Sequence, residues 1–236
     1  PDPDVVVFAA SSGGRGPEAA RDTYIEGQRT AIDHFGSRDD PPDRYVYTSS
    51  TGVYGDHGGE WVDETTPLDP DSERGEILVD AEQTALERPA EYGIDGTVAR
   101  LAGLYGPERY RLERYIEGPV TEGILNMVHR DDAAGAIAFL LSADEARGEV
   151  VLVVDDEPVE RTTFADWLAD SCGLDAPETQ TKAERLANVD SESARRRIRA
   201  SKRCSNDKLR ALGYDFQYPT FREGYARAIT SHQSGN

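Results

Sequence analysis

Four consecutive hydroxyl side chains, at residues 48–51, could hold and polarise an oxygen atom of a bound substrate. The preceding residues 45–47 are aromatic or β-branched, which predicts a buried strand that ends among these hydroxyls. Open α/β sheets bind their ligands at the carboxyl ends of the strands. The hydroxyl cluster that includes Ser50 is therefore a candidate ligand site, in which Ser50 could be catalytic. The alternative is that its hydroxyl group only caps the turn that follows the strand.

Tyr54 carries the nearest phenol that could pass a proton to a substrate held at Ser50. The alternative is that its ring packs as a wall of the same turn, and both roles stay open. A serine hydrolase is not indicated, because the residues around Ser49 and Ser50 lack a G-x-S-x-G elbow.

A histidine and two aspartates stand close together at His129, Asp131 and Asp132, which invites a metal-site or triad interpretation. We favour Asp132 as the N-cap of the apolar helical run that follows. The cysteines Cys172 and Cys204 lack the CxxC spacing of a zinc site. No metal site is predicted.

The elements that must position these groups alternate between strand and helix patterns. Strands are predicted at residues 5–10, 45–49 and 96–101, with helices from residue 17 to about 35 and from about 73 to Pro89. This order predicts an α/β fold with a doubly wound parallel, Rossmann-like sheet. The predicted core faces are Ala20, Tyr24, Ala31 and Phe35 in the first helix and Ile77, Ala81 and Ala85 in the second.

The second half of the chain is less regular. A strand at residues 125–128, a helix after Asp132, a strand at 150–154 and three further amphipathic helices are predicted. They indicate a smaller, mixed C-terminal lobe on the substrate side, some of whose elements return to the core. The predicted division is 1–103 for the nucleotide-binding part and 104–236 for mainly this lobe.

Four segments in this order resemble the extended short-chain dehydrogenase/reductase superfamily, in particular its NAD-dependent epimerases and dehydratases. They are residues 4–10, similar to the family's fourth strand, 45–55 with an SS-x-x-VYG turn, 100–107 with an RxxxxYGP pattern, and 126–132 with an N-x-V-H-x-D-D pattern. Residues 201–206, SKRCSN, look like the atypical, active-site-poor branch of that superfamily.

The resemblance implies NAD or NADP as cofactor and a small-molecule substrate that is sugar-like or phosphorylated. It is also compatible with a homodimer. The residues that would bind the cofactor are Ala9, Ala10, Ser11, Ser49, Tyr105 and Pro107. For Tyr105 and Pro107 the alternative is a simple turn.

Two departures from the family pattern bear on function. No glycine-rich phosphate loop precedes the first predicted strand, and residues 13–16, GGRG, have the wrong spacing for one. Two strand–helix units, roughly 60 residues, would come first in a complete fold. The chain alone is therefore expected to bind dinucleotides weakly or not at all, and it could be a fragment whose missing start carries the cofactor site.

The second departure is that the family's catalytic tyrosine and lysine positions fall on Arg74 and Leu78. A guanidinium stays protonated, so Arg74 could bind a carboxylate or phosphate but could not act as an acid. The predicted function is an NAD(P)-dependent epimerase/dehydratase-like oxidoreductase with a degenerate site at Ser50, Tyr54 and Arg74. The alternative is a non-catalytic nucleotide-binding or redox-sensing protein of the same fold.

The charge balance is strongly acidic, with 45 Asp plus Glu against 26 Lys plus Arg and a net charge of −19. Such a surface disfavours nucleic acid as a partner. Only three basic residues are lysines, Lys182, Lys202 and Lys208, and this scarcity indicates adaptation to high internal salt. No apolar run is long enough for a membrane span, so a cytoplasmic protein is expected.

One basic run interrupts this acidic sequence, at residues 195–199, RRRIR, followed by Lys202 and Arg203. It could hold the phosphate of a substrate or partner. The alternative, which we favour, is that it neutralises acidic surface nearby.

The net charge of −19 predicts that the fold becomes more stable as salt rises from ~0.1 M toward multimolar concentrations, because screening weakens the repulsion between like charges. A series of thermal melts across that range checks this. A melting temperature that stays flat or falls would contradict the adaptation to high salt.

Overall fold

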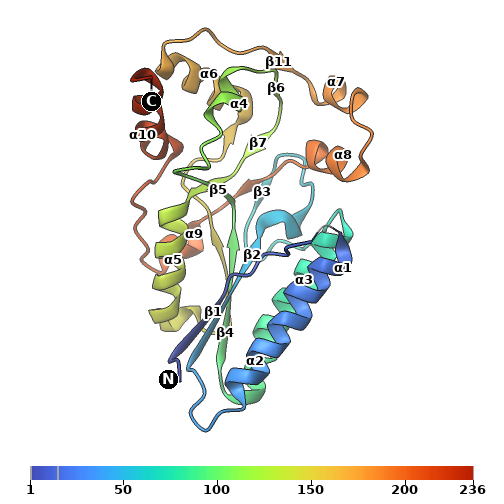
Figure 1. Ribbon diagram of the computed structural model, residues 1–236, viewed down its shortest axis with the longest axis vertical. Helices are drawn as coiled ribbons and strands as arrows, with labels where there is room; N and C mark the ends of the chain where they lie inside the picture. Colours follow the sequence, from blue (N-terminus) through green and yellow to red (C-terminus); the bar gives the residue numbers. More distant parts are fainter. Residues whose placement is uncertain (1, 15, 236) are drawn as a thin grey trace.

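The computed structural model describes residues 2–14 and 16–235, built around a parallel sheet of four strands. The strands are β1 (Val5–Phe8), β2 (Arg44–Ser50), β4 (Asp95–Leu101) and β9 (Val150–Val153), hydrogen-bonded in the order β1-β2-β4-β9 (Figure 1). Every neighbouring pair is parallel. The predicted Rossmann-like architecture is therefore confirmed.

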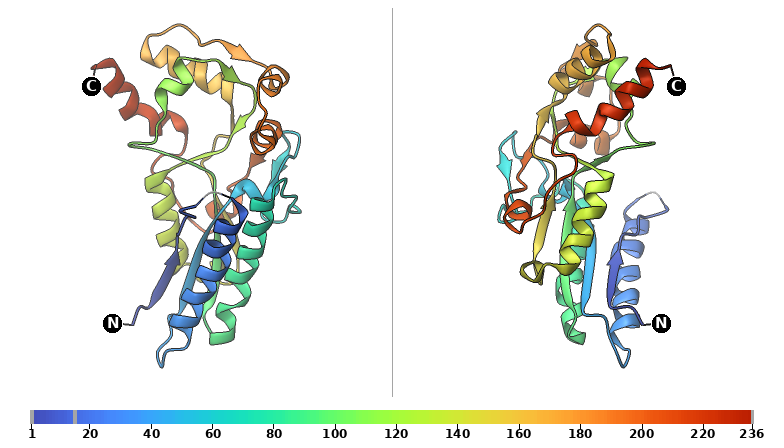
Figure 2. Two further views of the ribbon diagram at one scale, coloured as in Figure 1. Left: turned by 45° about the vertical axis from the view of Figure 1, so that its right-hand side comes forward. Right: turned by 90° about the vertical axis from the view of Figure 1, so that its left-hand side faces the viewer.

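Alternate residues of the strands build two separate cores. Tyr45 and Tyr47 of β2 pack with one cluster, whereas Val46 between them packs with the other. The first cluster lies under α1 (Pro17–Arg21), the π-helical turn η1 (Asp22–Gly27), α2 (Gln28–Gly36) and α3 (Glu73–Glu87), and the second under α5 (Arg130–Ser142). Helices thus cover both faces of the sheet (Figures 1 and 2).

The π-helical turn changes which face of the first helix is buried. A π turn holds one residue more than an α turn and shifts every later residue around the axis. After it, Ile32 is buried at 1% exposure, while Ala31 and Phe35 are only half-buried. The predicted face is therefore right at Ala20 and Tyr24 and wrong beyond them.

The rest of the chain forms an upper lobe and the connections to it (Figure 1). Its short two-stranded sheets are mixed, since β10 (Val159–Glu160) pairs antiparallel with β7 (Ile124–Leu125) while the others are parallel. None of the helices in the described part of the chain is long and apolar enough to cross a membrane. The remaining elements are η2 (Thr51–Tyr54), β3 (Trp61–Val62), η3 (Pro89–Tyr92), β5 (Gly103–Tyr105), α4 (Leu112–Ile116), β6 (Val120–Thr121), β7 (Ile124–Leu125), β8 (Met127–His129), η4 (Asp144–Ala146), β10 (Val159–Glu160), α6 (Arg161–Cys172), β11 (Thr179–Gln180), α7 (Lys182–Ala187), α8 (Glu192–Arg199), β12 (Arg203–Cys204), α9 (Asp207–Ala211) and α10 (Phe221–Gln233).

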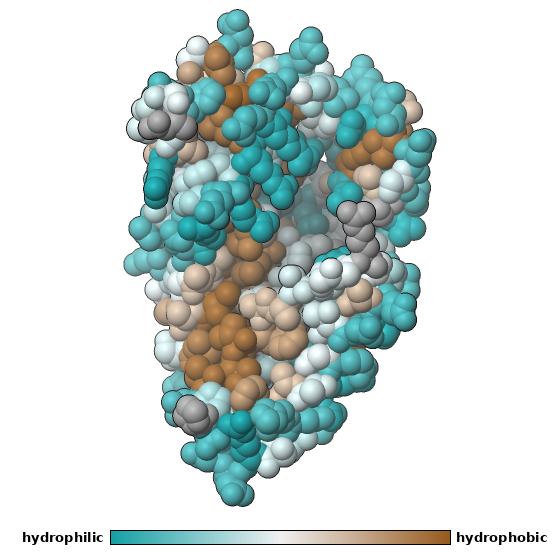
Figure 3. Space-filling model, viewed as in Figure 1, coloured by the Kyte–Doolittle hydropathy of each residue, from teal (hydrophilic) through white to brown (hydrophobic). Residues whose placement is uncertain are grey.

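Strand β1 lies at one edge of the main sheet and is unusually exposed for an apolar strand. Val5 and Val7 are 40% and 41% exposed. Hydrophobic residues gather over this strand on the face shown in Figure 3. In the described part of the chain, β1 pairs with β2 only.

Candidate functional site

Ser50 is the last residue of β2, as the sequence predicts, and it lies at the carboxyl edge of the sheet opposite Leu101 of β4. Its Oγ accepts a hydrogen bond of 3.2 Å from the backbone N–H of Gly52. The hydroxyl therefore does cap its own turn. It also lines a pocket of about 280 Å³, and the two interpretations are compatible.

This pocket combines three parts of the chain that are distant in sequence. The turn after β2 meets the N-terminal end of α3 and the segment from α8 to β12 (Figure 1). The pocket holds one carboxylate and three basic groups. These charged groups are Asp71, Arg74, Arg197 and Lys202.

Arg74 and Leu78 both line this pocket, so the structure brings the two substituted family positions close to Ser50. Arg74 Nη1 donates to Ser12 Oγ at 3.2 Å, and Nη2 donates to the hydroxyl of Tyr24 at 2.5 Å. The guanidinium also stacks over the Tyr24 ring, 5.2 Å from its centre. These contacts steady Arg74 and leave other N–H groups to donate to a ligand.

Tyr54 is fully buried, and its hydroxyl group is already engaged. It donates to the backbone oxygen of Asp63 at 2.6 Å and accepts from Arg100 Nη1 at 2.7 Å. Burial raises the pKa of the phenol far above its ordinary value, and the nearby Arg100 lowers it less. The geometry favours the packed-wall interpretation over the proton-donor interpretation.

The residues predicted to bind a cofactor fall into two groups. Ala9, Ala10 and Ser11 are exposed just beyond β1, and Ser49 has a buried Oγ with no hydrogen-bond partner among the described residues. The end of β1 is open, and the Oγ of Ser49 next to it is a buried polar atom without a partner in the described part of the chain. A polar ligand bound at this edge of the sheet could supply that partner.

Tyr105 and Pro107 form the second group, and Tyr105 lies in the upper lobe rather than on an open face. Its ring is 3% exposed and stacks on Tyr225 with 5.0 Å between ring centres. Its hydroxyl lies 3.4 Å from the backbone oxygen of Thr220. Pro107 is half-buried, and its backbone oxygen accepts a bond from Arg130. No observed contact supports their predicted role, which stays a prediction.

The cap of α5 differs from the predicted one. His129 is the N-cap, and its Nδ1 accepts a hydrogen bond of 3.3 Å from the N–H of Asp131. Asp132 instead accepts bonds from the backbone N–H groups of Gln217 and Tyr218. No three His, Cys, Asp or Glu residues within 2–14 and 16–235 are grouped so that they could hold a metal ion.

Lys202 belongs to the basic run of the sequence analysis, and the structure places it with Arg197 in the Ser50 pocket, whereas a role beside Ser50 was not predicted for it. Its Nζ donates to the backbone oxygen of Gly55 at 3.0 Å, and burial lowers the pKa of its ammonium group. The available signal was its chemical type, because a lysine is rare in a chain whose basic residues are nearly all arginines.

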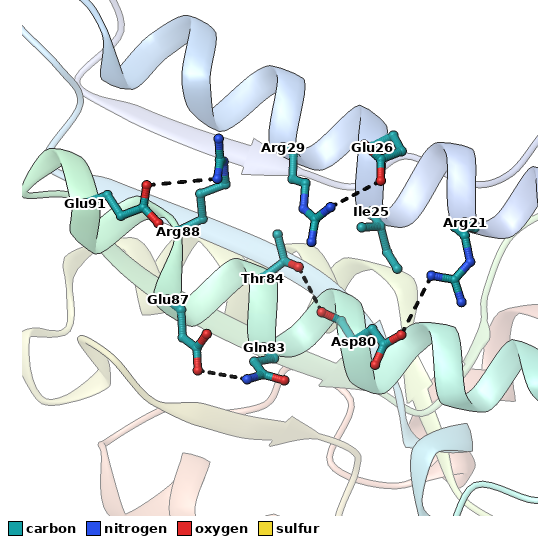
Figure 4. A pocket seen from close by; sticks show the side chains of 10 residues that line it. All are labelled: Arg21, Ile25, Glu26, Arg29, Asp80, Gln83, Thr84, Glu87, Arg88 and Glu91. Carbon is teal, nitrogen blue, oxygen red and sulfur yellow. Dashed lines mark hydrogen bonds and ion pairs between the residues drawn. The ribbon is translucent and has the colours of Figure 1, made fainter.

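A second hollow, of about 360 Å³, lies between helix α1–α2 and α3, away from Ser50. Three ion pairs lie along its walls, Arg29 with Glu26 at 3.2 Å, Arg21 with Asp80 at 3.9 Å and Arg88 with Glu91 at 3.9 Å, and Glu87 accepts a hydrogen bond from Gln83 (Figure 4). These pairs satisfy the charges of its walls, so this hollow is a weaker candidate for a ligand site.

Comparison with known proteins agrees with this architecture. The model of the NAD dependent epimerase/dehydratase family matches residues 1–153. The chain belongs to the NAD-dependent epimerase/dehydratase family. Protein YeeZ of Escherichia coli (strain K12) is 31% identical over 218 residues, which are 91% of this chain and 71% of that protein.

Two solved structures of other proteins are similar to this structure. A conserved protein from Silicibacter pomeroyi is 30% identical, with a TM-score of 0.75 over 98% of this chain and 77% of that one. The dTDP-glucose 4,6-dehydratase of Streptomyces venezuelae, solved with NAD, is 22% identical, with a TM-score of 0.75 over 98% of this chain and 73% of that one. The second likeness shows the shared fold alone.

Proposed function

We propose that this protein is a nicotinamide-dependent oxidoreductase of the epimerase/dehydratase type, with its substrate held at Ser50. The observation that carries the proposal is the pocket itself. It places a hydroxyl at a strand's carboxyl end beside three basic side chains and one acidic one, in a chain of net charge −19. Membership of the family supports the reaction class.

The proposed substrate is a small, sugar-like molecule with a phosphate or carboxylate group. Arg74 would bind that anionic group by charge-assisted hydrogen bonds, and Arg197 would face it from α8. Within the described part of the chain no ion pair occupies either guanidinium, so both remain available to an anion. The arginine at the family's tyrosine position would then serve binding rather than proton transfer.

Ser50 would donate its hydroxyl proton as a hydrogen bond to the reacting oxygen of the substrate. The cofactor, NAD or NADP, would supply hydride transfer when bound. Ala9, Ala10, Ser11 and Ser49 would hold its nicotinamide end, which is supported by their open position and by the unpartnered Oγ of Ser49.

Ser50→Ala is expected to lower kcat in the full-length protein by roughly 10²-fold, because it removes a polarising hydrogen bond. Turnover of phosphorylated and uronic-acid sugars with NAD and NADP, followed by absorbance of the reduced cofactor, measures this. Ser142→Ala is the control, since that exposed hydroxyl at the end of α5 bonds only Phe139 within the described structure.

Tyr54→Phe separates the two roles of that phenol. If Tyr54 packs the turn, the variant loses stability but keeps its turnover. A fall in turnover equal to that of Ser50→Ala would restore Tyr54 as the proton donor. Full turnover in both variants would remove the proposed site.

The alternative function is non-catalytic nucleotide binding or redox sensing. The observation that favours it is the loss of the tyrosine–lysine pair to Arg74 and Leu78. Dinucleotide binding in calorimetry, with no turnover of any substrate tested, would select this alternative.

A further inference from the structure

The three lysines of the chain have different surroundings. Lys208 pairs with Glu149 at 2.8 Å, and Lys182 donates to the backbone oxygen of Arg199 on an exposed surface. Lys202 is more buried, and no carboxylate in the described part of the chain lies within ion-pair distance of its Nζ. The lysine of the Ser50 pocket therefore has a neutral carbonyl oxygen as its partner.

The turn that carries this carbonyl oxygen is rigidly defined. Gly55 has a φ of 65°, a conformation that favours glycine, and a Cβ there would collide with the backbone oxygen of Asp69. The adjacent Tyr54 is fixed by its bonds to Asp63 and Arg100. A carbonyl oxygen accepts from either an ammonium or an amine, so Gly55 can hold Nζ in both protonation states.

Titratable groups face Lys202 from three segments of the chain. Asp56 and Asp71 come from the turn after η2 and the segment before α3, and Cys204 is a buried thiol in β12. The two aspartates favour the ammonium form, but burial outweighs them and lowers its pKa. Arg74 and Arg197 line the same pocket and would oppose a further positive charge.

The three basic side chains of the pocket differ in one chemical respect. Arginine does not give up its proton at any working pH, whereas a buried lysine can. We propose that Lys202 is the proton-transfer residue of this pocket and that it replaces the tyrosine which the family uses. The proposal rests on the proposed oxidoreductase function and adds the residue that this function lacks.

The proton-transfer step can be written in balance. The neutral Nζ takes the proton of a substrate hydroxyl whose oxygen Ser50 holds, and becomes an ammonium. With an oxidised nicotinamide dinucleotide bound, the hydride of the same carbon would pass to it, and the alcohol would become a carbonyl group. In the reverse direction the ammonium returns its proton to the oxygen as hydride arrives at carbon.

The first test needs no substrate. Reductive methylation with ¹³C-formaldehyde labels the three lysines of the protein, and NMR follows their titration with pH. Lys202→Arg assigns the signal by its disappearance. We expect the Lys202 signal to titrate below the ordinary range of a lysine side chain. A Lys202 signal that titrates within that ordinary range would overturn the proposal.

The second test separates the two proposals. Lys202→Arg keeps the charge but cannot transfer a proton, so kcat should fall roughly 10²-fold with KM little changed. Lys208→Arg is the matched control and should keep its turnover. Full turnover in Lys202→Arg with loss in Ser50→Ala would overturn the role of Lys202 and leave the proposed function standing. No turnover by the unaltered protein would overturn both.

Discussion

Glu82→Ala is expected to lower the free energy of unfolding by about 3–5 kcal/mol, because it leaves a buried guanidinium without its partner. The side chains of Arg100 and Glu82 are only 5% and 4% exposed, and they meet at 2.7 Å. Arg100 Nε also lies 3.0 Å and 3.1 Å from the two carboxylate oxygens. Urea unfolding followed by circular dichroism measures the change.

Glu91→Ala provides the control for Glu82→Ala. Glu91 also faces an arginine, Arg88, but at 3.9 Å and with 63% of its side chain exposed. Such surface pairs contribute about 0–1 kcal/mol. If the two variants lost equal stability, the claim that the buried Arg100–Glu82 pair is a main source of stability in the sheet would be wrong.

The same ion pair is connected to the candidate site. Arg100 donates to the Tyr54 hydroxyl and stacks over its ring at 5.0 Å. Tyr54 in turn lies in the short turn between Ser50 and Gly55. Loss of Glu82 should therefore loosen the turn that presents both the candidate serine and the carbonyl oxygen that holds Lys202.

Asp132→Ala is expected to lower the free energy of unfolding by about 3 kcal/mol, because it removes a buried carboxylate that accepts from two backbone N–H groups. Its carboxylate accepts from the N–H of Gln217 at 2.7 Å and the N–H of Tyr218 at 2.8 Å, whereas the hydroxyl of Tyr214 lies 3.0 Å from the backbone oxygen of Asp132, which the variant keeps. Asp132 is 2% exposed, so water replaces these bonds poorly. Chemical unfolding gives the loss, and hydrogen exchange at residues 217 and 218 locates it.

Asp131→Ala is the matched control one residue earlier. Its side chain is 52% exposed, and its contact with Arg130 at 3.5 Å is a surface ion pair. We expect little change in stability. A loss as large as that of Asp132→Ala would contradict this prediction. It would mean that both aspartates stabilise the start of α5, and that the contact of Asp132 with the C-terminal segment contributes little.

Local patterns were enough to predict the sheet and its helices. The strand run at 45–49, the helical spacing of Ile77, Ala81 and Ala85, and the hydroxyl cluster at the strand edge were found as expected. The reason is that burial on a pleated strand or on one side of a helix repeats with a fixed period. The run at 5–10 forms a shorter strand, Val5–Phe8, in which Val5 and Val7 are exposed. The division at residue 103 stays a prediction.

The periodicity of apolar residues could not predict where a helix changes register or which side chains become hydrogen-bond partners. The π turn in the first helix moved the buried face from Ala31 to Ile32 through one additional residue. Asp132 matched the pattern of a helix cap, but its partners come from more than 80 residues further along the chain. A local pattern carries no information about a donor that tertiary folding brings in.

The sequence by itself determined the family, the Rossmann-like sheet and the position of Ser50 at its carboxyl edge, because these depend on short motifs and local periodicity. Only the tertiary structure decided which groups surround that serine. It buried Tyr54 against Arg100 and brought Lys202 to Gly55, 147 residues away in the sequence. The chemistry of the pocket depends on desolvation and on the approach of distant side chains, and both exist only in the folded chain.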